Sequence, residues 1–157
     1  MSDARLEAIE EAYRVGLDGY CSVANAILHD HDAARDAVQE AFATAVRRRD
    51  SFRSEGPIEA WLWRIVVNTA KTAAARRSWA SMVIPVGADA DSGVLPDVQQ
   101  EIARLPERQR LALFLRYYAD LDYRTIAEVL EVAPGTVGAT INAAHGTLRR
   151  RLGEAFG

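Results

Sequence analysis

The chain has little with which to form a disulfide, hold a metal or cross a membrane. Cys21 is its only cysteine, so an intramolecular disulfide and a cluster of thiolate ligands are both excluded. No apolar run approaches the roughly 18 residues that a transmembrane helix needs. Met1 is followed by polar residues rather than by the apolar core of a signal peptide. These features predict a cytoplasmic protein without membrane insertion.

Strong positive charge and catalytic motifs are also lacking. The formal net charge of −3 argues against a protein that coats nucleic acid non-specifically, although charge can be segregated along a chain. His29 and His31 flank a predicted turn without further ligands, so no metal site is expected. The sequence contains no nucleophile–base arrangement, phosphate-binding loop or carboxylate pair. We therefore predict neither enzymatic activity nor a cofactor.

The chain is rich in helical periodicity. Apolar residues at steps of three and four predict one helix over 6–28 and a second from about 34, which ends in the cations Arg47, Arg48 and Arg49. An aspartate in the intervening turn, 29–32, is expected to cap the second helix. After a polar loop over 50–56, Pro57 suits the first turn of a third helix that runs to Arg77.

The third helix is expected to turn one face to the core. The predicted inner residues are Ile58, Trp61, Leu62, Ile65 and Thr69. Trp61 is assigned to this core. Trp63 has two interpretations, a core residue or an aromatic surface on which a base stacks.

Residues 80–96 break the helical pattern, because two glycines and two prolines interrupt them without any sustained period. Helical periodicity returns after this segment, through Leu105, Leu111, Leu115 and Tyr118. The predicted fold is therefore all-α. It consists of a three-to-four-helix domain over 1–79, a flexible linker over 80–96 and a helix-turn-helix domain over 97–157.

Charge is segregated within the first domain. Residues 1–46 carry three arginines against nine acidic residues, whereas residues 47–77 carry eight basic residues against three acidic ones. Two interpretations are open. The charges are either solvated helix faces, or they serve a protein partner on one side and a polyanion on the other.

The segment from Tyr123 to Val137 has the pattern of a helix-turn-helix. A short helix turns Ile126, Ala127 and Leu130 inward, and Val132 and Ala133 form the turn. Pro134 begins a second helix, whose expected buried residues are Val137, Ile141, Ala144 and Leu148. Such a pattern places the second helix in the DNA major groove, although a plain helical hairpin has the same spacing.

Several motifs resemble those of extracytoplasmic-function (ECF) sigma factors. LPERQR at 105–110, LFLRYY at 113–118 and LDYRTIA at 121–127 resemble the region 4 signature of that family. DAVQEAF at 36–42 is similar to region 2.2, and WLWRIVVNTAK at 61–71 to the region 2.3–2.4 helix. The matches occur in the family's order and cover nearly the whole chain.

The resemblance implies a sigma factor that binds core RNA polymerase and directs promoter recognition and DNA opening. Two alternatives stay open. One is a sigma-like decoy that binds an anti-sigma factor or polymerase without reading promoters, and the other is a DNA-binding activator that shares only the helix-turn-helix. An anti-sigma factor is an expected partner both of a sigma factor and of a sigma-like decoy.

The resemblance also assigns roles to residues. Region 2.2 docks on the β′ clamp helices through positions that match Asp36, Gln39, Glu40 and Phe42, of which Phe42 is expected to be half in the core. Region 4 docks on the β flap. The segment 51–56 resembles the loop that captures an unstacked −10 base. Candidate contacts to the −10 strand are Arg53, Ser54, Arg64, Asn68, Lys71, Arg76 and Arg77.

The recognition helix departs from the family pattern. No lysine or arginine lies between Arg124 and Arg149, and each missing phosphate contact lowers affinity because fewer counterions are released. Candidate −35 contacts are Thr136, Thr140, Asn142, His145 and Arg149, and weak binding is expected. The run Arg149–Arg151 is either a phosphate clamp or a set of cations at a helix C-terminus, and the second interpretation is favoured.

Overall fold

The computed structural model describes residues 3–53, 56–81 and 98–156, and every regular element within these ranges is a helix. In chain order the elements are α1 (Ala4–Leu28), α2 (His31–Arg47), a 3-10 helix η1 (Arg49–Ser51), α3 (Ile58–Ser81), α4 (Val98–Ala103), α5 (Glu107–Tyr117), α6 (Tyr123–Leu130) and α7 (Pro134–Phe156). The predicted all-α fold is confirmed. The predicted linker falls almost wholly outside the described residues.

Aspartates cap three of these helices. The side chain of Asp30 accepts hydrogen bonds from the backbone N–H groups of Asp32 and Ala33, at 2.9 and 3.1 Å, and so begins α2 in the predicted turn. Asp3 and Asp122 cap α1 and α6 in the same way. At its other end α1 stops because His29 adopts the left-handed conformation, with a φ of 55°.

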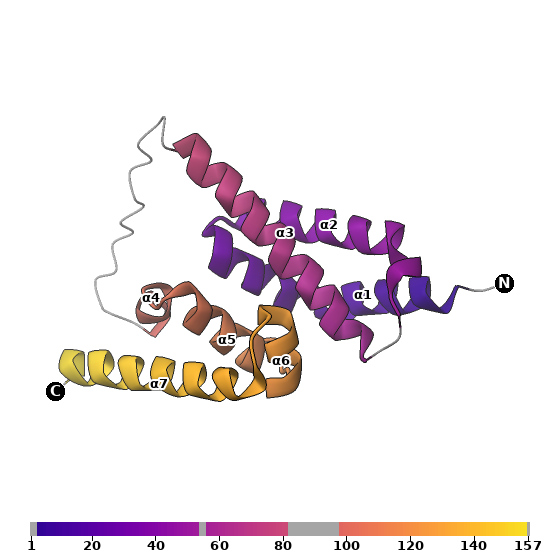
Figure 1. Cartoon of the computed structure of the whole chain (residues 1–157). Helices are drawn as coiled ribbons and strands as arrows, with labels where there is room; N and C mark the ends of the chain where they lie inside the picture. Colours follow the sequence, from indigo (N-terminus) through magenta and orange to yellow (C-terminus); the bar gives the residue numbers. More distant parts are fainter. Residues whose placement is uncertain (1–2, 54–55, 82–97, 157) are drawn as a thin grey trace.

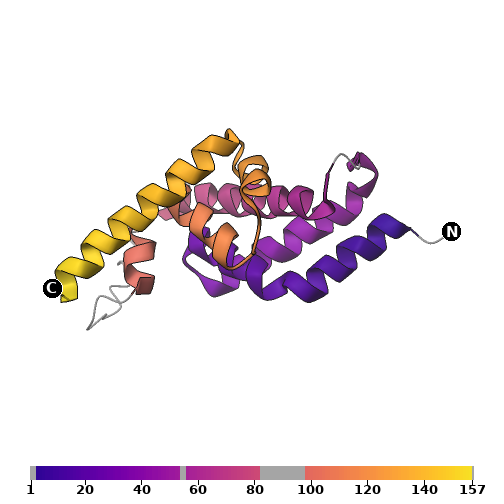
Figure 2. The same cartoon turned by 90° about the horizontal axis from the view of Figure 1, so that it is seen from below.

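The helices form two bundles that lie against each other (Figures 1 and 2). Helices α1, α2 and α3 pack together as the first bundle, and α4 to α7 form the second. The bundles meet where α3 contacts α6 and where α1 contacts α5. Helix α7 runs along the outer side of the second bundle, away from α3 (Figure 1).

The core of the first bundle is built around a chain of aromatic rings. Tyr20 contacts Phe42 and Trp63, with ring centroids 5.0 and 4.3 Å apart, and Trp63 is only 4% exposed. Trp61 instead lies half-buried beside Phe52, at 5.4 Å. Trp61 thus packs against the core and is only partly buried, whereas Trp63 lies within the core and has no free face on which a base can stack.

The predicted inner face of α3 is displaced by one position. Among the described side chains of α3, the buried ones are Ala60, Leu62, Trp63, Val66, Val67 and Ala70. Of the predicted face only Leu62 is fully buried; Ile58, Trp61, Ile65 and Thr69 are partly exposed. The cause is that apolar residues fill eight of the eleven positions from 60 to 70, so the periodicity does not select one face.

The second bundle follows the predicted helix-turn-helix pattern. Ile126, Val137, Ile141 and Ala144 are all at most 2% exposed, and α6 ends in the left-handed conformation at Glu131. One expectation here is wrong. The run 149–151 does not lie at a helix C-terminus, because α7 continues to Phe156 and Arg151 lies 3.6 Å from the Glu101 carboxylate.

Candidate nucleic-acid and protein interfaces

The exposed side of α3 carries a stripe of polar side chains. Arg64, Asn68 and Lys71 follow one another at spacings of four and three residues, and all three are exposed. Arg53 is exposed on the segment that leads from η1 towards α3, whereas Ser54 lies outside the described residues. Cations with an amide between them suit a single nucleic-acid strand, because cations bind phosphates and an amide reads a base edge.

A small hollow of about 170 Å³ lies beside this stripe, between α2 and α3. It is lined by Glu40, Asn68, Thr69, Thr72 and Arg76. All five side chains end in hydrogen-bonding groups, and none makes a hydrogen bond or ion pair within the described part of the chain. The hollow therefore brings an acceptor, an amide and a cation together on the side of α3 that faces solvent.

Arg77 has a structural partner. Its guanidinium donates to the Leu28 carbonyl and to the Asp30 carboxylate, both at 3.1 Å, and joins α3 to the turn between α1 and α2. The pKa of Asp30 lies below its usual value, mainly because of the hydrogen bond from the backbone of Ala33, with Arg77 contributing further. Among the predicted strand contacts, Arg77 thus differs from Arg76, which is unpaired within the described residues.

The predicted protein-binding row on α2 divides between two sides of the helix. Asp36, Gln39 and Glu40 are exposed. Gln39 borders an open groove of about 340 Å³ whose other residues are Ile9, Glu10, Tyr13, Phe42, Ala43 and Val46. Phe42, expected to be half in the core, is 6% exposed and forms part of the floor of this groove. Glu40 borders the α3 hollow instead.

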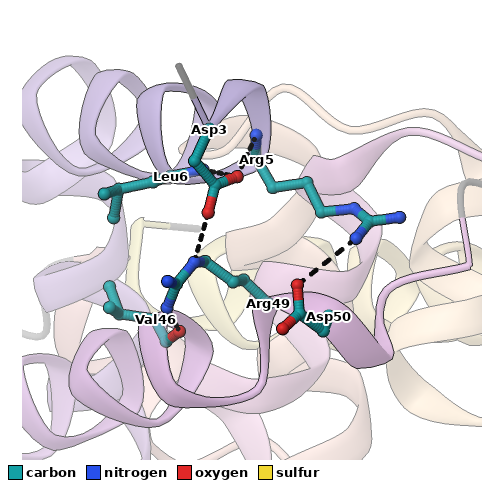
Figure 3. A network of polar contacts seen from close by, with 6 residues as sticks. All are labelled: Asp3, Arg5, Leu6, Val46, Arg49 and Asp50. Carbon is teal, nitrogen blue, oxygen red and sulfur yellow. Dashed lines mark hydrogen bonds and ion pairs between the residues drawn. The ribbon is translucent and has the colours of Figure 1, made fainter. Parts of the chain in front are cut away.

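A polar network fixes the start of the loop that follows α2 (Figure 3). Arg49 donates to the Asp3 carboxylate and, at 2.7 Å, to the Val46 carbonyl. Arg5 lies 3.5 Å from Asp50. The hydrogen bond from Arg49 lowers the pKa of Asp3. Through these contacts the N-terminus of α1 holds η1, and η1 positions the segment that carries Arg53.

The candidate −35 residues on α7 are partly engaged within the protein. The hydroxyl of Thr140 donates to the Thr136 carbonyl at 2.7 Å. His145 lies 3.0 Å from the Tyr117 hydroxyl, and the two rings stack with centroids 5.8 Å apart. Asn142 and Arg149 are exposed without such contacts in the described part of the chain. Among the candidate −35 residues on α7, the exposed amide of Asn142 is therefore available to a partner.

Two contacts between the bundles each involve one residue to which the sequence assigned no role: Glu131 in the first and Arg110 in the second. Nη2 of Arg64 lies 3.0 Å from Oε1 of Glu131, at the end of α6. Arg110 on α5 is 9% exposed and donates from Nε to the Ala26 carbonyl of α1 at 2.9 Å. An acidic residue at a helix C-terminus interacts unfavourably with the helix dipole. The position of Glu131 at the end of the short helix was the one signal in the sequence that distinguished this residue.

The remaining expectations concern metals and membranes. Within the described residues no group of three or more histidine, cysteine or acidic side chains could hold a metal ion. In the same part of the chain no helix is both long and apolar enough to span a bilayer.

Two family models match the chain: Sigma-70 region 2 over residues 13–80, and Sigma-70, region 4 over residues 96–144. The RNA polymerase sigma-H factor of Pseudomonas aeruginosa is 34% identical over 146 residues, covering 80% of this chain and 76% of the relative. The ECF RNA polymerase sigma-E factor of Escherichia coli K12 is 33% identical over 138 residues, covering 74% of this chain and 72% of the relative.

Solved structures show the same fold. The sigma factor RpoE of Bartonella quintana, in complex with the anti-sigma factor NepR, superposes with a TM-score of 0.74 and 23% identity over 91% of this chain and 95% of its own. CnrH, in complex with the cytosolic domain of CnrY, superposes with a TM-score of 0.71 and 19% identity over 93% and 88%. Family models, relatives and fold agree, and the chain belongs to the sigma-70 family of RNA polymerase sigma factors, in its extracytoplasmic-function group.

Proposed function

We propose that this sigma factor binds core RNA polymerase through α2, holds the melted −10 strand along α3 and places α7 at the −35 element. The observation that carries the proposal is the exposed stripe of Arg64, Asn68 and Lys71 on a helix whose opposite face is packed in the core. We assign the first two tasks to a domain over residues 1–79 and the third to a domain over 97–157.

Polymerase docking is assigned to the exposed row of Asp36, Gln39 and Glu40, facing the β′ clamp helices. Carboxylates and an amide suit a basic helical surface, since complementary charge orients a partner and speeds its association. The apolar groove beside Gln39 gives such a helix a place to bury an aliphatic side chain. The second domain is assigned to the β flap.

Strand holding is assigned to α3 and to the segment before it. Arg53, Arg64, Lys71 and Arg76 supply cations for phosphates, and Asn68 supplies an amide for a base edge. Because Trp63 is buried, it does not serve as a surface on which a base stacks. Binding the unpaired strand favours the open form of the promoter over the duplex. The chain thus acts by binding and not by catalysis.

The −35 contact is expected to be weak. Helix α7 offers Asn142 as an exposed amide, and Arg149 as the first cation along it. With so few phosphate contacts, promoter choice rests mainly on the −10 strand.

We also infer that an anti-sigma factor binds this chain and that the chain acts in the cytoplasm. The support for this partner is the fold shared with RpoE, which was solved in complex with the anti-sigma factor NepR. The fold is also shared with CnrH, which was solved in complex with the cytosolic domain of CnrY.

The direct test is transcription in vitro by core polymerase, with and without the chain, on a library of genomic fragments. We expect discrete start sites that depend on the chain, and their loss when Arg64 and Asn68 are both replaced by alanine. A decoy would open no promoter, so the absence of any chain-dependent start site would refute the proposal and favour that alternative.

A further inference from the structure

We propose that Asp3 and Arg49 are positioning residues for the −10 strand: their contact holds η1 against the start of α1, and so places Arg53 where the strand passes. This inference rests on the proposed role of α3 and of the segment before it in holding that strand. Neither Asp3 nor Arg49 touches DNA in that function, so both act through Arg53.

Arg49 joins three segments of the first bundle (Figure 3). It belongs to η1, its Nε donates to Oδ2 of Asp3 beside α1, and its Nη1 donates to the Val46 carbonyl of α2 at 2.7 Å. The side chains of Arg49 and Asp3 are 33% and 35% exposed. Water therefore competes less for this pair than for an ion pair on the open surface.

The Asp3 carboxylate is itself held in place by the helix that it caps. Its Oδ1 accepts hydrogen bonds from the backbone N–H groups of Arg5 and Leu6, at 3.1 and 3.3 Å, which leaves Oδ2 to face Arg49. A hydrogen bond between two charged groups is stronger than a neutral one, and this one lowers the pKa of Asp3 and raises that of Arg49. The neighbouring Arg5–Asp50 contact is weaker, because it spans 3.5 Å and Asp50 is 90% exposed.

Helix η1 has little of its own to fix its position. Short 3-10 helices have poor hydrogen-bond geometry, none of the three residues of η1 is buried, and no side chain caps it. The backbone N–H groups of Ser51 and Phe52 donate to the carbonyls three residues back, at 2.8 and 3.3 Å. Such an element keeps its place through its side chains, and Arg49 supplies two hydrogen bonds for this purpose.

The far end of η1 is held by α3. Phe52, the residue after η1, packs against Trp61 with the ring centroids 5.4 Å apart, and Arg53 is exposed next to it. The segment is thus held on one side by the contact of η1 with α1, and on the other by the two rings. Without the first contact the segment is held mainly by the rings, and Arg53 spends less time where a phosphate can reach it.

The network is separate from the surface proposed for polymerase. Neither Asp3 nor Arg49 lines the groove beside Gln39 or the hollow that contains Glu40. A substitution of Asp3 is therefore expected to act on the DNA strand and to leave the binding of core polymerase unchanged.

The test compares Asp3→Asn with Asp122→Asn in the holoenzyme, on a promoter obtained from the fragment library. Asparagine caps a helix as well as aspartate does, so Asp3→Asn keeps α1 capped and removes the charge that Arg49 contacts. Asp122 caps α6 in the second bundle, so its variant removes the same charge from a cap away from η1. We expect Asp3→Asn to open the promoter about three- to five-fold less than Asp122→Asn, the change that a partly exposed ion pair supports.

Three further measurements separate positioning from general stability. The two variants should have equal melting temperatures and equal affinities for core polymerase. In a chain that already carries Arg53→Ala, Asp3→Asn should reduce promoter opening hardly further, whereas a stability defect would add to the loss. Amide hydrogen exchange at Ser51 and Phe52 should be faster in free Asp3→Asn than in free Asp122→Asn, because η1 is released locally.

Equal promoter opening by the two asparagine variants would overturn the inference, as would additive losses from Asp3→Asn and Arg53→Ala or equal exchange at η1. Failure of the proposed function is visible separately. In that case the wild-type holoenzyme opens no promoter, whereas failure of this inference alone leaves wild-type opening intact.

Discussion

Gln39 and Glu40 are neighbours in the sequence, yet they border different surfaces: Gln39 lies over the groove between α1 and α2, and Glu40 over the hollow between α2 and α3. The hollow also contains Asn68 and Arg76, which belong to the proposed strand-holding surface. The surfaces that we propose for polymerase binding and for strand holding therefore meet at Glu40.

This arrangement predicts different effects for two substitutions on α2. Gln39→Ala should weaken binding to core polymerase and leave strand binding unchanged. Glu40→Lys should weaken core binding and also tighten the binding of single-stranded DNA, because it places a cation beside Arg76. Core affinity is measured by fluorescence titration, and strand affinity with the chain alone.

The matched control is Glu11→Lys, a charge reversal on α1 outside both the groove and the hollow. It breaks only the exposed contact with Arg14, so helical content, melting temperature and both affinities should stay near the wild-type values. If Glu40→Lys leaves core binding unaltered, its assignment to the polymerase interface is wrong.

A second prediction concerns where promoter specificity lies. Asn68→Ala and Arg64→Ala should each reduce promoter opening by about 1–3 kcal/mol, the usual value of one base-reading contact. The double replacement of Thr140 and Asn142 by alanine should cost less than either, because the Thr140 hydroxyl already donates to Thr136. Promoter opening is measured at a fixed holoenzyme concentration. A greater loss for the double variant would show that α7 reads the −35 element after all.

The third prediction concerns the phosphate-binding cations that the first part of α7 lacks. Ala139 and Ala143 are exposed on the recognition helix, and replacing both by arginine should strengthen binding of the holoenzyme to duplex promoter DNA. Two new phosphate contacts should steepen the slope of log affinity against log salt by about 1.8. Val15→Arg adds a cation at a position on α1 that is 75% exposed and should change neither quantity. An unchanged slope in the double variant would mean that this face does not meet DNA.

The fourth prediction concerns stability. His29 ends α1 with a φ of 55°, a conformation that glycine adopts without steric cost. His29→Gly should therefore raise the free energy of unfolding by about 1 kcal/mol. His31→Gly, two residues on and inside α2, should lower it or leave it unchanged. Both are measured by urea denaturation at neutral pH, and destabilisation by His29→Gly would contradict the strain argument.

The sequence by itself determined the helices and the family. Apolar residues at steps of three and four located α1, α2 and the helix-turn-helix, because the periodicity there is clear, and an aspartate in the turn 29–32 marked the start of α2. The motifs at 36–42, 61–71 and 105–127 identified the sigma-factor resemblance, since local residue order carries them. The polar candidates on α3 were visible as well, because Arg64, Asn68 and Lys71 lie within the motif at 61–71.

Only the tertiary structure decided which face of α3 is buried and what its cations contact. Trp63 enters the core and Trp61 stays half-exposed because Tyr20 and Phe42, from two other helices, form the site that receives one ring. Arg77 pairs with Asp30, and Arg64 with Glu131, which lies 67 residues further along the chain. Spacing within one helix carries no information about such partners, because they depend on how separate helices pack.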